Sequence, residues 1–142
     1  MAEDTATSAS INVAFGTVAA GMMVIAEAHD GVFSAPRVQP TASFTLHPFA
    51  HCLHYGSTCF EGLKAHRGAD GAVRIFRLDR HVARMRRTAD LVQLPVPPAD
   101  LLEGMIVAAV EANLDEVPGA PGALYLRPML LGTDPNIGAA AT

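Results

Sequence analysis

The chain has 142 residues, which is enough for one domain with a buried core, and half of these residues are hydrophobic. Its formal net charge is −4 and it has no dense run of lysine or arginine, which argues against a nucleic-acid-binding protein. Charged residues make up 17%, below the roughly 25% of an average soluble domain. Either a face covered by another domain or subunit, or a bias toward alanine, would explain this shortfall.

The start of the chain predicts neither a membrane segment nor a secretory signal. Residues 1–13 are read as an acidic, small-residue tail that we expect to be disordered. The uncharged run Ile11 to Ala26 is too short for a confident membrane span, and acidic rather than basic residues precede it. Cys52 and Cys59 fit neither a redox pair nor a disulfide framework. These features together predict a cytoplasmic protein.

The first expected elements are a β-hairpin and a helix. Asp30-Gly31 is a turn signal between two apolar runs, so Gly21 to Val38 is predicted to form a hairpin. Pro48 suits the first residue of a helix, which we expect to end near Gly62. That helix would present Cys52, Tyr55 and Cys59 along one side.

Strands and helices then alternate to the end of the domain. Leu63 to Arg67 and Ala72 to Arg77 read as paired strands, joined by a glycine-containing loop. Asp79 is expected to cap a helix that runs to about Leu91, and a second helix should span roughly Ala99 to Leu114. Ala123 to Leu131 reads as a strand. Strand pairs with separate helices predict an α+β domain, with an antiparallel sheet and flanking helices.

Arg127 is a charged residue inside the apolar strand expected from Ala123 to Leu131. A buried guanidinium is costly unless it is paired, and Pro128 weakens the strand ladder, which predicts an edge or a bulge here. Two interpretations stay open on local pattern. The arginine either pairs with a core carboxylate or faces the carboxylate of a ligand. The planar guanidinium can donate to both oxygens of a carboxylate.

Two other groups of polar side chains carry weaker signals. His47, His51 and His54 lie at helical spacing, with Glu61 as a conceivable fourth ligand or base. No known metal-site spacing fits, and we predict no metal. Arg84 lies on the helix expected after Asp79. On local pattern alone it is a solvated side chain.

Several runs of the sequence match one known family in order. They are Ala14-Phe15-Gly16-Thr17, Val38-Gln39-Pro40, Leu46-His47-Pro48, Leu53 to Ala65, Ile75-Phe76-Arg77, Ala83 to Ala89 and Leu124 to Gly138. From about residue 14 to its end, the chain resembles the N-terminal small domain of branched-chain amino-acid aminotransferases. This family belongs to the class IV (fold type IV) enzymes that depend on pyridoxal 5'-phosphate (PLP). The run Leu53 to Ala65 is the most specific.

The resemblance implies a substrate pocket. Tyr55, Phe60 and Phe15 match aromatic residues that line the side-chain pocket in the family. Tyr125 and Arg127 match the residues of a later motif, whose arginine binds the distal carboxylate of glutamate or 2-oxoglutarate. Aromatic walls suit an aliphatic side chain, and an arginine with a tyrosine hydroxyl suits a carboxylate.

The resemblance also implies cofactor and subunit contacts. Arg84 matches a helix arginine that contacts the phosphate of PLP. Ile137 and Ala139 belong to a loop that reaches across a dimer interface in the family, and they are expected to line a partner subunit's pocket. A homodimer is therefore expected, and Ala139 is smaller than the residue usual at its position.

The family's larger second domain, which carries the Schiff-base lysine, has no counterpart in this sequence. Lys64 is the chain's single lysine, but it follows the motif glutamate and is not expected to bond PLP, so no catalytic residue is assigned. The expected division is a tail over 1–13, a small domain over 14–131, and a loop over 132–142 that leads to an interdomain linker.

The leading hypothesis is the small domain of an enzyme that moves amino groups between leucine, isoleucine or valine and 2-oxoglutarate. Two alternatives remain. One is another class IV enzyme, such as a D-amino-acid aminotransferase or an aminodeoxychorismate lyase. The other is a non-catalytic truncated domain that binds a full-length relative.

Overall fold

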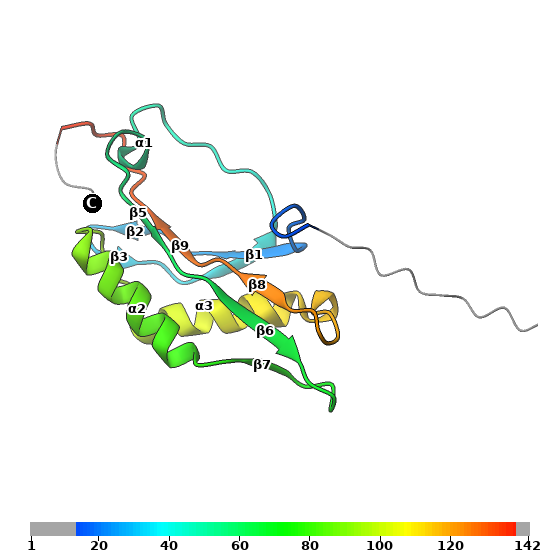
Figure 1. The fold of residues 1–142 in the computed structure, drawn as a ribbon. Helices are drawn as coiled ribbons and strands as arrows, with labels where there is room; N and C mark the ends of the chain where they lie inside the picture. Colours follow the sequence, from blue (N-terminus) through cyan, green and yellow to red (C-terminus); the bar gives the residue numbers. More distant parts are fainter. Residues whose placement is uncertain (1–13, 139–142) are drawn as a thin grey trace, which may run out of the picture.

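The computed structural model describes residues 14–138, which form a mixed α/β unit (Figure 1). Its strands pair only in antiparallel fashion, and helices lie against one side of them, so the α+β prediction is confirmed. The predictions for the tail over 1–13 and for Ala139 concern residues outside the described range. The division into domains is not tested by the structure and stays a prediction.

The predicted hairpin is present and carries two pairs of strands. β1 (Met22–Ile25) pairs with β4 (Arg37–Pro40), and β2 (Ala28–His29) pairs with β3 (Val32–Phe33). Asp30 and Gly31 form the turn, with φ angles of 51° and 76°. A two-residue hairpin turn of this hand needs positive φ at both positions, which asparagine, aspartate and glycine tolerate best.

A long antiparallel ribbon forms the centre of the fold (Figure 1). β5 (Thr58–Phe60) pairs with β9 (Met129–Leu131), and β6 (Leu63–Arg67) lies between β7 (Val73–Ile75) and β8 (Leu124–Leu126). The expected strand from Ala123 to Leu131 is thus interrupted at Arg127 and Pro128. The Glu61 N–H still donates to the Pro128 carbonyl, at 2.9 Å, across this interruption. β8 and β9 each lie at the edge of their sheets, so the edge position predicted for Arg127 is confirmed. The pairs Phe60–Met129 and Leu63–Leu126 leave two residues on each side of the interruption, so it is not a bulge.

The prediction of a helix from Pro48 to Gly62 is wrong at both ends, since Pro48 lies in a turn before the helix. α1 covers only His51–Tyr55, and Gly56 ends it in the left-handed conformation at φ 63°. Cys59 therefore lies on β5, rather than on a helix face shared with Cys52 and Tyr55. Glycine adopts positive φ without the steric cost of a Cβ, so it is a common helix terminator.

Two longer helices cover the ribbon. α2 spans Leu78–Leu91 and α3 spans Ala99–Ala112, followed by a 3-10 turn over Leu114–Glu116. Both helices were predicted, but Asp79 is not the cap of α2. It lies in the first turn and accepts a hydrogen bond from Nε of Arg77, at 3.2 Å, while Arg77 occupies the cap position.

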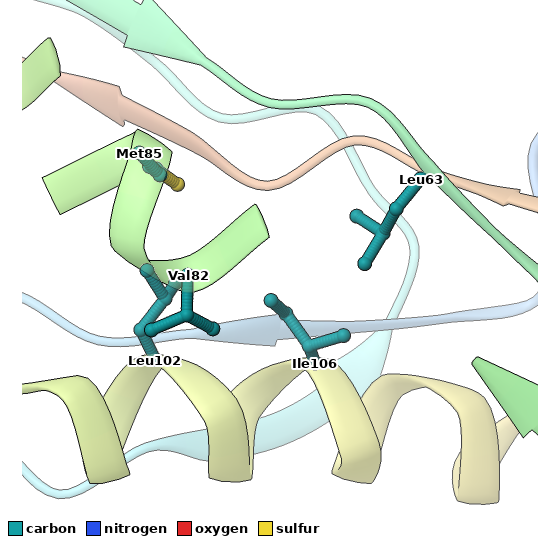
Figure 2. Close-up of a cluster of buried hydrophobic side chains, with 5 residues drawn as sticks. All are labelled: Leu63, Val82, Met85, Leu102 and Ile106. Carbon is teal, nitrogen blue, oxygen red and sulfur yellow. The ribbon is translucent and has the colours of Figure 1, made fainter. Parts of the chain in front are cut away.

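The main core lies between these helices and β6 (Figure 2). It is formed by five buried side chains: Leu63, Val82, Met85, Leu102 and Ile106. A second cluster joins Cys59, Ala89 and Leu94 beside it. The strand segment from Ser57 to Ala65 contributes every second residue to this inner side, because odd-numbered residues are buried and even-numbered ones are not.

Candidate functional site

The outer face of the ribbon carries a cluster of aromatic rings around one guanidinium. The guanidinium carbon of Arg127 lies 4.2 Å from the ring centre of Phe60 and 5.2 Å from that of Tyr125. Its Nε and Nη2 atoms donate to the Tyr125 hydroxyl at 3.1 and 2.8 Å. Phe15 packs edge-on against Tyr125, with ring centres 4.9 Å apart. Four of the residues predicted for the substrate pocket are therefore in contact.

The charge of Arg127 is not neutralised by a carboxylate. Within residues 14–138 it forms no ion pair, and it is exposed. The reading in which Arg127 pairs with a core carboxylate is therefore wrong. Its contacts are two rings and a phenol hydroxyl, which hold the guanidinium in place while leaving its charge available to an anion.

Gly62 allows Tyr125 to lie close to the backbone. A Cβ built at this position would collide with the Tyr125 hydroxyl and approach its Cζ atom to 3.2 Å. Any other residue at position 62 would push the ring away, and with it the hydroxyl that receives both Arg127 donors. Gly62 was expected only at the end of a helix, so this role was not predicted, although a glycine in an extended segment often marks a close approach.

The cluster forms a wall, not an enclosed pocket. Phe15 and Phe60 are 74% and 59% exposed, so one side of the cluster is open. Two hollows of the described surface lie away from this cluster. One lies between β3 and the start of α3, and another between β7 and α3.

Arg84 lies on α2 and is bound to Glu61, on the inner side of the ribbon. Its Nε donates to Oε2 of Glu61 and its Nη2 to Oε1, both at 2.5 Å. Oε1 also accepts the Gly62 N–H at 2.8 Å, and Nδ1 of His81 lies 3.5 Å away. The Arg84 side chain is 64% exposed, whereas that of Glu61 is 7% exposed.

These contacts set the charge state of Glu61. The hydrogen bonds from Arg84 lower the pKa of Glu61 from 4.5 to about 2, against the opposing effect of burial, and the Gly62 N–H adds to the lowering. Glu61 is thus a buried carboxylate that stays ionised at neutral pH. From the sequence, Glu61 was considered only as a metal ligand or base, and its ion pair with Arg84 was not predicted.

Tyr55 and Ile137 make a second contact. The Tyr55 hydroxyl donates to the Ile137 carbonyl at 2.5 Å, and both side chains are exposed. This bond ties the end of α1 to the loop that follows β9. Tyr55 contacts this loop and the rings of His51 and His54, and none of these belongs to the Arg127 cluster.

The three histidines weighed as metal ligands make local hydrogen bonds. Nδ1 of His51 lies 2.5 Å from Oγ of Ser57, Nε2 of His54 lies 2.8 Å from the Pro48 carbonyl, and His47 accepts the Phe49 N–H. No group of three or more potential ligands within residues 14–138 could hold a metal ion. None of the helices in this range is long and apolar enough to cross a membrane.

No family model matches the chain. It is similar to the branched-chain-amino-acid aminotransferase of Haemophilus influenzae, at 36% identity over 129 residues, which are 89% of this chain and 38% of that protein. It is 34% identical to branched-chain-amino-acid transaminase 1 of Bacillus subtilis, over 92% of this chain and 37% of that protein. The names of other relatives place them in the cytosol, mitochondria or chloroplasts.

A solved structure shares the fold. A branched-chain amino acid aminotransferase from T.th., complexed with N-(5'-phosphopyridoxyl)-L-glutamate, aligns with a TM-score of 0.67 and 25% identity. The alignment covers 87% of this chain and 37% of that one. The chain thus spans little more than a third of the length of these proteins.

Proposed function

We propose, on the premise that this chain is a homologue of one part of the branched-chain-amino-acid aminotransferases, that it supplies the substrate-pocket wall of such an enzyme. The reaction would move an amino group between leucine, isoleucine or valine and 2-oxoglutarate. The observation that carries this proposal is Arg127, an exposed guanidinium held by rings and paired with no carboxylate among residues 14–138.

The cluster suits a pocket that must accept two kinds of side chain in turn. Phe60, Phe15 and the ring of Tyr125 offer apolar surface to an aliphatic side chain. Arg127 offers charged donors to the distal carboxylate of 2-oxoglutarate, and the hydroxyl of Tyr125 fixes the direction in which the guanidinium faces. Because Arg127 is held from two sides, it stays in place when the aliphatic substrate occupies the pocket.

PLP is the cofactor that we propose, and the residues present fit one of its contacts. A phosphate requires a cation or backbone amides, and the Arg84 guanidinium is a largely exposed cation whose Nη1 atom is not used by Glu61. When bound, PLP supplies the electron-withdrawing ring that such amino-group transfers require. Arg84 would hold its phosphate, and the Phe60 face of the ribbon would exclude water from the substrate side chain.

The remaining parts of the proposal concern the whole enzyme. We place the residue that bonds PLP in a larger domain that is absent from this sequence, and we assign 14–131 to the small domain. Tyr55 is proposed to line the substrate side-chain pocket. Ile137, whose carbonyl accepts the Tyr55 hydroxyl, is proposed to line a partner subunit's pocket together with Ala139, in a homodimer. The cytoplasm is the proposed location.

The test is the substrate dependence of Arg127→Ala in the full-length protein. Loss of a charge-assisted pair should lower kcat/KM for 2-oxoglutarate by about 10- to 100-fold, the equivalent of roughly 1.5–3 kcal/mol. The value for the 2-oxo acid of leucine should change much less. Arg74→Ala, at an exposed arginine of the β6–β7 turn region, is the matched control.

Equal losses for the two 2-oxo acids would contradict the role of Arg127. A full-length protein that uses D-amino acids in place of leucine would favour the other class IV activities. A natural protein with the mass of this chain alone, 14.9 kDa, would exclude the proposal of a second domain.

A further inference from the structure

Glu61 is the most unusual charged group in the described structure, because it is ionised and almost completely buried. Its side chain is 7% exposed, and its two oxygens accept both donors of one edge of Arg84 and the Gly62 N–H. A buried carboxylate is expensive unless its partners remain in place, and removal of a partner leaves an uncompensated charge. Arg84 is therefore held to Glu61 far more strongly than an exposed arginine on a helix would be.

The same contact fixes which part of Arg84 faces outward. Nε and Nη2 each bind one carboxylate oxygen, so one edge of the planar guanidinium is directed at Glu61. The side chain is still 64% exposed, and Nη1, the nitrogen not bound to Glu61, remains available. An arginine in this arrangement loses little further freedom when it meets an anion.

We propose that Glu61 is a positioning residue that holds the Arg84 guanidinium ready for the phosphate of PLP. This inference rests on the proposed function, in which Arg84 meets that phosphate. Glu61 does not touch the phosphate itself. It acts through Arg84, and through its bond to the Gly62 N–H it also lies next to the backbone against which Tyr125 packs.

Electrostatics alone predicts the opposite sign. A carboxylate beside an anion site repels the anion, so neutralising Glu61 should strengthen phosphate binding if charge were its only contribution. Positioning predicts that binding weakens when the fixed guanidinium is released. The change of Glu61→Asp separates the two effects further, because it keeps the negative charge but withdraws the carboxylate from Arg84.

The experiment compares PLP with pyridoxal, which lacks the phosphate, on the full-length protein freed of cofactor. Calorimetric titration gives the ratio of their dissociation constants, which reports the phosphate contact. We expect Glu61→Gln and Glu61→Asp each to reduce the preference for PLP over pyridoxal by about two- to tenfold. This is the change in dissociation constant that corresponds to the entropic cost of fixing one long side chain. Asp70→Asn, at an exposed ion pair with Arg74, should leave the ratio unchanged.

A wild-type ratio in Glu61→Asp, or a greater preference for PLP in Glu61→Gln, overturns the inference. The variant Arg84→Ala distinguishes a wrong assignment of Arg84 from a wrong role for Glu61. If it leaves the ratio unchanged, the assignment of Arg84 to the phosphate is wrong. If it lowers the ratio while both Glu61 variants do not, only the positioning role is wrong.

If circular dichroism shows that the Glu61 variants do not fold, the positioning role is tested by NMR on the wild-type protein. In ¹⁵N spectra, the Arg84 Nε–H signal, assigned by its loss in Arg84→Lys, should exchange slowly with water before any ligand is added. It should then shift on addition of PLP. An Arg84 signal that exchanges as fast as that of an exposed arginine such as Arg80 overturns the inference.

Discussion

Neutralising Glu61 should make the stability of the protein less dependent on pH in the acid range. Arg84 is the main cause that lowers the pKa of Glu61 from 4.5 to about 2. One pKa unit corresponds to about 1.4 kcal/mol, so the full lowering would represent roughly 3 kcal/mol. Because water screens the largely exposed Arg84, we expect Glu61→Gln to lower the free energy of unfolding at pH 7 by about 1–2 kcal/mol.

The sign follows from the direction of the pKa change. The pKa of Glu61 is lower in the folded state, so its contribution is fully present above pH 4.5 and is lost as the pH falls toward 2. Urea unfolding of the wild type and of Glu61→Gln between pH 7 and pH 2.5 measures this contribution. The difference in unfolding free energy should be largest at neutral pH and shrink below pH 4.5.

A matched variant separates this effect from a general effect of lost carboxylates. Asp70→Asn removes a carboxylate whose pKa Arg74 lowers, but that pair is exposed on both sides, and we expect only a small change in stability. A difference between wild type and Glu61→Gln that stayed constant from pH 7 to pH 3 would refute the reasoning. It would mean that packing, not ionisation, determines the cost of the change.

Two further changes test a contact between the end of α3 and β1 and a contact within the site. Asn113 is buried, and its side chain forms hydrogen bonds with the N–H and the carbonyl of Met22 at 2.8 and 3.0 Å. Asn113→Ala should therefore lower the free energy of unfolding in urea by about 2–3 kcal/mol. A loss below about 0.5 kcal/mol would argue against a stabilising role of these bonds. Gly62→Ala should leave the protein folded but displace the Tyr125 ring, seen as shifts of its ring proton signals. Gly104→Ala, where the added methyl meets nothing, is the control; unchanged Tyr125 signals in Gly62→Ala would count against the close approach.

Much of the fold could be predicted because local signals decided it. The Asp30-Gly31 turn set the first hairpin, and apolar residues at helical spacing placed α2 and α3 within a few residues of their ends. The exception was α1. Cys52, Tyr55 and Cys59 fit a helical spacing, but Gly56 ends the helix after five residues and the chain continues as a strand.

The candidate site was harder to predict because its contacts join distant segments. Phe15, Phe60 and Arg127 were expected in one pocket only through the resemblance to a family. In the structure Phe15 packs against Tyr125, and Arg127 contacts both Tyr125 and Phe60. The bond between Arg84 and Glu61 joins residues 23 positions apart. Local sequence indicated a solvated arginine at position 84, because no pattern within one helix reveals a partner between two strands.

The extended segment from Ser57 to Ala65, which contains β5 and the start of β6, shows what signal would have revealed Glu61. Side chains alternate between the two faces of a strand, and here the inner positions include Cys59, Leu63 and Ala65. Glu61 is the charged member of that inner row. If this segment had been predicted as extended chain in place of a helix, the buried carboxylate would have indicated a cation opposite it. Its neighbour Phe60 points outward to Arg127 for the same reason. One alternating run of residues therefore serves both faces, with the proposed pocket on one and the support of the proposed phosphate contact on the other.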